Sequence, residues 1–331
     1  MSSTESSITA PKKVGRPPKQ SSTAANNPTL KGAVDKPQND SNDVFEIIMP
    51  DPSVWISSAS QIKLQNPTFV TFIADSGGVR FVAPSHQNNA AFSIYIPAKA
   101  CVSYFLKDNK KRVFKLPYTS SDTNTDAFDE FVKRIPKRAN IVILSVKSKS
   151  PDEMEFTTIN TSLTTTRIIK FEDTAEPSLA THIQRFESES KSDVIVPIDC
   201  NTKKQQETLL GACTHVEYGT HQRGVKLISV SFDPKRCCFR FVGSKKASAE
   251  FTPISDITDE YKKMTALDMS LDERYLHGMI KFISRGVANT SIKATHEYFM
   301  IRGTFSTKNS VGVKFDIHVD STSIPKTELK M

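Results

Sequence analysis

Apolar and polar positions alternate most clearly in the last third of the chain. Between residues 271 and 285 the apolar side chains recur at helical spacing, which predicts an amphipathic helix with a second, basic face. The apolar positions are Leu276, Met279, Ile280 and Ile283, and the basic positions are Arg274, Lys281 and Arg285. Three strand-like segments follow, at 290–295, 298–305 and 312–319. The stretch therefore predicts a helix backed by an antiparallel meander.

The same order of a strand, a helix and three strands occurs three more times earlier in the chain. The earlier helices are expected from Pro52 onward, at 126–137 and at 202–218. Two copies precede a polar stretch and two follow it. We therefore predict an α+β fold of two domains, 44–171 and 194–319, each with two strand–helix–three-strand units and its helices on one face of the sheets.

Three segments outside these domains lack the periodicity. Residues 172–193 are acidic and serine-rich and are interpreted as a connector between the domains, with a short helix as the alternative. Their isolated apolar side chains are Leu179, Ile183 and Phe186. Residues 320–331 are interpreted as a C-terminal tail. Residues 1–43 have almost no large apolar side chains and are interpreted as a disordered basic tail.

The N-terminal tail contains a Gly-Arg-Pro core, centred on Arg16 and flanked by lysines. It resembles an AT-hook, a peptide whose arginine enters the narrow minor groove of A·T-rich DNA. A solvated basic patch or a nuclear-targeting run explains the same residues, and both readings stay open.

Composition limits the class of protein. The chain has 331 residues, 37% of them hydrophobic, which excludes global disorder. We expect no membrane helix, because no run approaches about 18–20 apolar residues. The five cysteines show no CxxC spacing and are expected to be reduced thiols of an intracellular protein. The net charge of +8 favours an anionic partner.

The sequence lacks the motifs that mark catalytic, metal and cofactor sites, among them GxGxxG, GxSxG, HExxH and the P-loop. Ser85 and His86 are adjacent on an extended stretch, where their side chains point apart. Cys213 and His215, and the pair Cys237 and Cys238, lack metal-ligand spacing. We expect no enzyme activity, no metal and no cofactor.

Cations occur on all four predicted helices, whereas we expect the acidic residues to concentrate in loops and in the connector. If the helices line one surface, that surface would bind phosphates without reading bases. For any single helix, an ordinary solvated face explains the cations equally well. The candidate DNA-binding residues are Lys63; Lys133, Arg134, Lys137 and Arg138; Lys203 and Lys204; Arg274, Lys281 and Arg285; and Arg16 in the tail.

Over residues 44–319 the order and spacing of these units resemble the DNA sliding clamps of the proliferating cell nuclear antigen family. Four local stretches are similar to the family as well. They are Arg274-Tyr275-Leu276, the Ser-Ile-Lys-Ala-Thr strand at 291–295, Val313-Lys314-Phe315-Asp316-Ile317, and the hairpin at 69–82 followed by Ser93-Ile94-Tyr95-Ile96.

The resemblance implies a ring-shaped homotrimer that encircles double-stranded DNA and tethers the replicative polymerase, with a clamp loader as a further partner. The helices would line the channel. Partner proteins would dock a short peptide beneath the connector, at Leu179, Ile183, Phe186, Ile324 and Pro325. Neighbouring subunits would pair a strand near 153–160 with one near 249–253. The expected location is the nucleus or a viral replication site.

This chain departs from the family in its basic charge, its short C-terminal segment and its Gly-Arg-Pro tail. A basic extension on a divergent clamp is more typical of large DNA viruses. The alternative function is therefore a viral transcription or replication accessory factor that has the clamp fold without encircling DNA. An enzyme with an unrecognised site is the third hypothesis.

Overall fold

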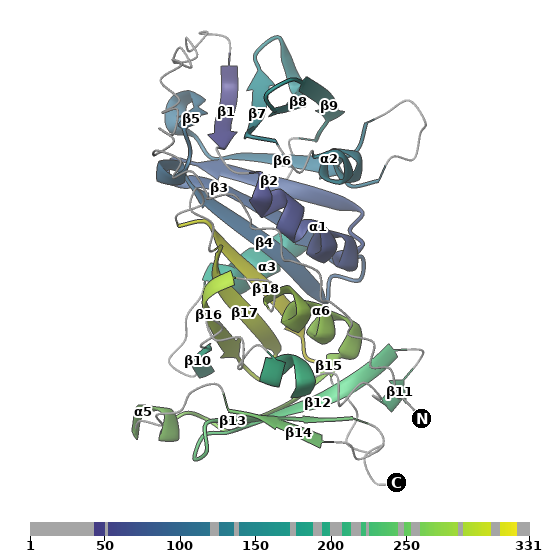
Figure 1. Cartoon of the computed structure of the whole chain (residues 1–331), viewed down its shortest axis with the longest axis vertical. Helices are drawn as coiled ribbons and strands as arrows, with labels where there is room; N and C mark the ends of the chain where they lie inside the picture. The colour runs from purple at the N-terminus through teal and green to yellow at the C-terminus, as the bar shows by residue number, and fades with distance from the viewer. Residues whose placement is uncertain are drawn as a thin grey trace, which may run out of the picture. The chain divides into compact units, whose positions relative to one another are not determined.

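The computed structural model divides the chain into two units, 1–40 and 41–331, and every residue that it describes lies in the second unit. The described residues are 43–49, 52–119, 126–135, 139–172, 177–187, 194–198, 207–212, 220–222, 225–243, 248–252, 259–283, 287–305 and 312–322. Strands form three antiparallel sheets (Figure 1).

The first sheet has five strands in the order β5-β1-β7-β8-β9. Their bounds are β1 (Asp43–Met49), β5 (Ser103–Leu106), β7 (Ile141–Lys147), β8 (Ser150–Ile159) and β9 (Thr164–Lys170). Alternate residues such as Val142, Leu144 and Val146 are buried, as expected of strands with one face on a core. All of these strands come from the first half of the chain.

The second sheet has eight strands in the order β10-β16-β17-β18-β4-β3-β2-β6 and joins the two halves of the chain. Its strands are β2 (Phe69–Asp75), β3 (Gly78–Pro84), β4 (Ala90–Pro97), β6 (Arg112–Pro117), β10 (Val194–Ile198), β16 (Val287–Ala294), β17 (Tyr298–Phe305) and β18 (Lys314–Asp320). The junction is the pair β18 and β4, in which Ile317 faces Phe92 and Phe315 faces Ile94. One continuous sheet therefore runs through both halves.

The third sheet lies in the second half of the chain. Its strand β12 pairs with β11 and β13 and also with β15, and β13 pairs with β14. The bounds are β11 (Thr220–Gln222), β12 (Val225–Asp233), β13 (Cys238–Val242), β14 (Ser248–Phe251) and β15 (Leu267–Asp272).

Helices cover both faces of the eight-stranded sheet, as the alternation of buried residues along β2 demonstrates. Phe72 packs in the main core with Trp55 of helix α1, at a ring distance of 5.9 Å. Its neighbour Ile73 points the other way and packs with Leu179 and Phe186 of helix α3. The helix bounds are α1 (Ser53–Gln65), α2 (Phe128–Arg134), α3 (Pro177–Glu187), α5 (Asp259–Lys262) and α6 (Glu273–Ile283), and residues 207–212 are also helical.

The connector contains α3, so the alternative of a short helix there is correct. The helices of the repeated units, α1, α2 and α6, share the main core on one face, as predicted. The α+β class is confirmed.

Helices α1 and α6 come from the first and the fourth unit and touch at Gly278. Gln61 Nε2 donates a hydrogen bond to the Gly278 carbonyl at 2.6 Å. A Cβ atom at position 278 would overlap Cδ2 of Leu64, so the absent side chain permits this close approach. The contact places the exposed sides of α1 and α6 next to each other.

Candidate functional site

The exposed side of α1 and α6 carries three of the predicted DNA-binding residues. Lys63 and Lys281 lie in the last turns of α1 and α6, and both are exposed. Arg274 is the second residue of α6. Its guanidinium lies 4.5 Å from the centre of the Tyr275 ring and 3.7 Å from Asp272, and its side chain is 56% exposed. The structure therefore brings Lys63, Arg274 and Lys281 onto neighbouring helices.

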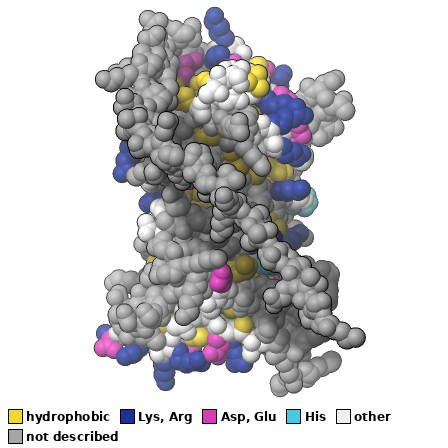
Figure 2. Space-filling model, in the orientation of Figure 1, with side chains coloured by type: hydrophobic (Ala, Val, Ile, Leu, Met, Phe, Trp, Pro, Cys, Tyr) yellow, Lys and Arg dark blue, Asp and Glu magenta, His cyan; other side chains and the backbone are white. Residues whose placement is uncertain are grey.

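Helix α2 differs from the prediction, because its cations are neutralised within the helix. Lys133 Nζ lies 2.7 Å from Asp129 Oδ2, and Arg134 Nη2 lies 2.7 Å from Glu130 Oε2. The hydrogen bond to Asp129 raises the pKa of Lys133. The expectation that acidic residues concentrate in loops and the connector is wrong for α2, which carries its own carboxylates at i−4. Figure 2 accordingly shows acidic side chains among the Lys and Arg side chains.

The remaining predicted cations lie outside the described residues. They are Arg16, Lys137, Arg138, Lys203, Lys204 and Arg285. Of the predicted partner-groove residues, Ile324 and Pro325 also lie outside the described residues.

Leu179, Ile183 and Phe186 come together on α3 and face the sheet. Leu179 and Phe186 are 2% and 4% exposed, and they pack with Val82, Ala91 and Met300. Ile183 is partly buried against the same cluster. Their apolar surface is used for attaching α3 to the sheet, and a partner peptide would have to displace the helix to reach it.

Polar contacts attach α3 along its length, and sequence reasoning did not find them. Nδ1 of His182 lies 3.0 Å from Nε2 of His318 on β18. Arg185 pairs with Asp320, and Arg302 Nη2 donates to the carbonyl of Phe186 at 3.0 Å. These partners are far apart in the sequence, and no spacing of His, Arg or Asp signals their contact.

The two histidines are neutral at pH 7. Burial lowers the pKa of His182 to about 4, and the charge of Arg185 acts in the same direction. Burial also lowers the pKa of His318 well below its ordinary value. In the neutral pair the N–H of one ring donates a hydrogen bond to the bare nitrogen of the other, so protonation of both rings would remove the acceptor and the hydrogen bond.

Acid is therefore expected to destabilise the attachment of α3. Unfolded histidine titrates near pH 6.5, so below that pH the unfolded chain binds more protons than the folded one. The stability that the neutral pair contributes is complete above pH 6.5 and is lost between pH 6.5 and about 4. For His182 alone we expect a loss of about 2 kcal/mol at pH 5. Urea unfolding at pH 7.5 and pH 5 measures it.

A double variant, His182→Leu with His318→Leu, supplies the control. Its free energy of unfolding should fall less between these two pH values. An equal fall in the variant and the wild type would show that other groups cause the acid sensitivity.

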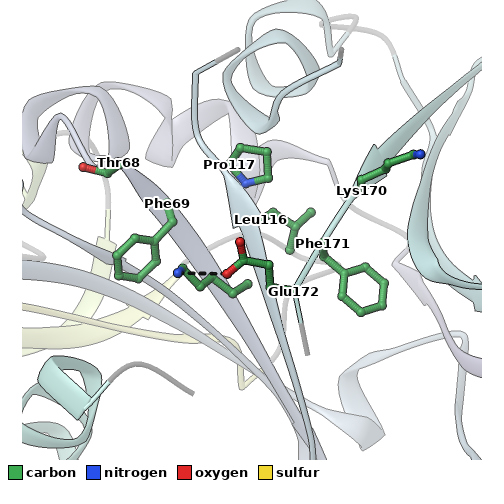
Figure 3. Close-up of a pocket in the computed structure, with 8 residues that line it drawn as sticks. Thr68, Phe69, Leu116, Pro117, Lys170, Phe171 and Glu172 are labelled. Atoms are coloured by element: carbon green, nitrogen blue, oxygen red, sulfur yellow. Dashed lines mark hydrogen bonds and ion pairs between the residues drawn. The ribbon is translucent and has the colours of Figure 1, made fainter. Parts of the chain in front are cut away.

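A pocket of about 370 Å³ lies where β9 leads into the connector (Figure 3). Lys115 Nζ lies 3.1 Å from Glu172 Oε2 and 4.8 Å from the centre of the Phe69 ring. Figure 3 shows the rings of Phe69 and Phe171 on either side of Glu172. Apolar side chains next to a paired cation suit the binding of an apolar side chain.

Ser85 and His86 do not form a catalytic pair. Ser85 Oγ bonds Asn89 and the backbone of the same turn, whereas His86 Nδ1 contacts Thr68 at 3.2 Å. Within the described ranges, no group of three or more His, Cys, Asp or Glu side chains could hold a metal ion. Among the helices that the structure describes, none is long and apolar enough to cross a membrane.

Several described strands pair with one other strand only, and two of them lie at the edges of the first and the third sheet. Among the described strands, β9 pairs with β8 alone and β14 with β13 alone. The expectation that a strand near 153–160 meets a neighbouring subunit is wrong, because that strand is β8 and is paired on both sides. The edge strand is β9, where Ile168 is 47% exposed.

Comparisons with known proteins bear on the fold. No protein-family model matches the sequence, and a search of curated proteins finds no match. Among solved structures, the crystal structure of Proliferating Cellular Nuclear Antigen from Entamoeba histolytica matches with a TM-score of 0.56 and 10% sequence identity. The match covers 85% of this chain and all of that one. The chain therefore has the clamp fold.

Proposed function

We propose that the chain is a sliding clamp, a homotrimeric ring that encircles double-stranded DNA and tethers a replicative polymerase. The packing of α1 against α6 carries the proposal, because it joins helices from opposite halves of the chain into one exposed surface that bears Lys63, Arg274 and Lys281. Such a surface attracts phosphates without reading bases and permits sliding.

The unpaired edges of β9 and β14 support ring formation. Strands β9 and β14 belong to the sheets at the two ends of the described part (Figure 1). Pairing β9 of one copy with β14 of the next would join two different patches, and such head-to-tail contacts close into rings. Exposed Ile168 on β9 and the row of unpaired backbone groups are what such a contact would bury.

The remaining parts of the proposal follow from this function. Lys137, Arg138, Lys203, Lys204 and Arg285 would extend the phosphate-facing surface, and Arg16 would add a further contact. Lys133 and Arg134 would contribute less, because Asp129 and Glu130 neutralise them. A closed ring needs a clamp loader to open it on DNA. The protein would act in the nucleus or at a viral replication site, and the domain boundaries are those proposed from the sequence.

Retention on circular DNA tests the clamp. We expect a trimer in native mass spectrometry and protein that stays on a nicked circle but slides off once the circle is cut. Ile168→Asp places a charge on the β9 edge and should give monomers that are not retained. Val102→Asp, at another exposed apolar residue, next to β5 in the same sheet, should leave both properties unchanged.

A wild-type monomer, or binding that survives cutting of the circle, would contradict encirclement. Either result would favour the accessory factor that has the clamp fold without closing around DNA.

A further inference from the structure

A second pocket, of about 390 Å³, opens beside the end of α3 on the face of the eight-stranded sheet opposite α1 and α6. Three cationic side chains and one carboxylate line it: Arg80 of β3, Arg302 of β17, and Lys314 and Asp316 of β18. The rings of Tyr95 and Phe186 form apolar parts of its wall. The lining is positively charged.

Asp316 holds the two guanidinium groups in place. Its Oδ2 lies 3.4 Å from Arg80 Nη1, and its Oδ1 lies 3.3 Å from Arg302 Nε. Asp316 is 8% exposed, and burial raises the pKa of its carboxyl group. With both oxygens engaged, this one carboxylate does not balance Arg80, Arg302 and the exposed Lys314.

A weak internal contact supplies the other negative charge. Oε1 of Glu187, at the end of α3, lies 3.7 Å from Arg80 Nη2, and the Glu187 side chain is 59% exposed. Arg80 is 16% exposed, but a 3.7 Å contact to a carboxylate that is itself solvated contributes little stability and can be replaced by another carboxylate. An incoming carboxylate could therefore take the place of Glu187 on Arg80 while Lys314 pairs with a second acidic group.

We propose that this pocket binds an acidic peptide segment of a partner protein, with Arg80 and Lys314 as its charge contacts. The volume of the pocket lies in the range of known ligand pockets. Its aromatic rings can pack against the side chains that lie between the acidic residues of the peptide. This site needs no displacement of Leu179 or Phe186, which already fill the apolar surface under α3.

An acidic peptide is favoured over DNA by the position of the pocket. Lys314 and Asp316 alternate along β18 with Phe315 and Ile317, which pack in the core beneath α6. The inference rests on the proposed function, in which α1 and α6 face DNA. The opposite face of the sheet is then accessible to protein partners.

Fluorescence anisotropy of a fluorescein-labelled hexaglutamate peptide with the full chain tests the site. Lys314→Ala should weaken binding about three- to tenfold, and Glu187→Gln should strengthen it about two- to threefold. Lys107→Ala and Asp268→Asn, at exposed positions on other strands or loops, are the matched controls and should change binding little. A hexaglutamine peptide should not bind.

Equal losses in Lys314→Ala and Lys107→Ala would overturn the proposal, because binding would then follow net charge. Displacement by millimolar inorganic phosphate would instead identify a small-anion site.

Retention on circular DNA should be insensitive to Lys314→Ala, and a loss as large as that caused by Lys281→Ala would show that the pocket faces DNA. Lys314-dependent peptide binding by a protein that never stays on circles would uphold the inference and contradict the clamp.

Discussion

Replacing Gly78 with alanine is expected to lower the free energy of unfolding by about 3 kcal/mol. Gly78 has φ of +150°, a conformation that residues with a side chain rarely adopt. An added Cβ would also overlap the carbonyl oxygen of Ile96 and lie 2.8 Å from Cα of Pro97. These are backbone atoms of the paired strand β4, so no side-chain rotation relieves the clash. Chemical denaturation of the purified variant measures the loss.

Gly211→Ala is the matched control. Residue 211 is helical and exposed, and a Cβ there meets nothing within 4 Å. Because alanine has a higher helix propensity than glycine, the free energy of unfolding of this variant should rise by about 0.5–1 kcal/mol. A Gly78→Ala protein as stable as the wild type would mean that the turn from β2 to β3 adopts another conformation.

Reversing the three cations of α1 and α6 should lower affinity for duplex DNA about a hundredfold at 0.1 M salt. The variant combines Lys63→Glu, Arg274→Glu and Lys281→Glu. Each change removes an attraction to phosphate and adds a repulsion, so the salt dependence of binding should also flatten. Fluorescence anisotropy over a salt series, together with circular dichroism to verify folding, measures both effects.

A second triple variant tests whether position or total charge matters. Lys107→Glu, Lys226→Glu and Lys235→Glu change the same number of exposed cations on loops and strands. This variant should retain most of the affinity. Equal losses in the two variants would contradict the assignment of α1 and α6 to the DNA-facing surface.

The helices of the main core could be predicted because their own sequences contain the necessary pattern. Leu276, Met279, Ile280 and Ile283 recur at helical spacing, and all four are buried in α6. The neutralisation of α2 was also present in the sequence, since Asp129 and Lys133 are four residues apart, as are Glu130 and Arg134. This i,i+4 spacing of opposite charges indicates that Lys133 and Arg134 are weaker candidates for DNA binding than the other cations.

The pairing of strands could not be predicted in the same way. The sequence predicts a strand at β8 and another at β9, and only the order of strands in the sheet distinguishes the interior one from the edge. The contacts of α3 are similarly hidden, because His182 and His318 meet through the fold of two distant segments. A connector with three apolar side chains is compatible with an extended strap and with a helix.

The pairing of β18 with β4 has a consequence for how the chain folds during synthesis. Strand β4 lies near the start of the described chain, whereas β18 is its last strand. During synthesis β2, β3 and β4 leave the ribosome long before β18 does. The edge of β4 that pairs with β18 therefore remains unpaired through most of translation. Contacts of such high sequence separation slow folding and leave a template for aggregation. We infer that the nascent first half depends on chaperones more than its own buried core would indicate.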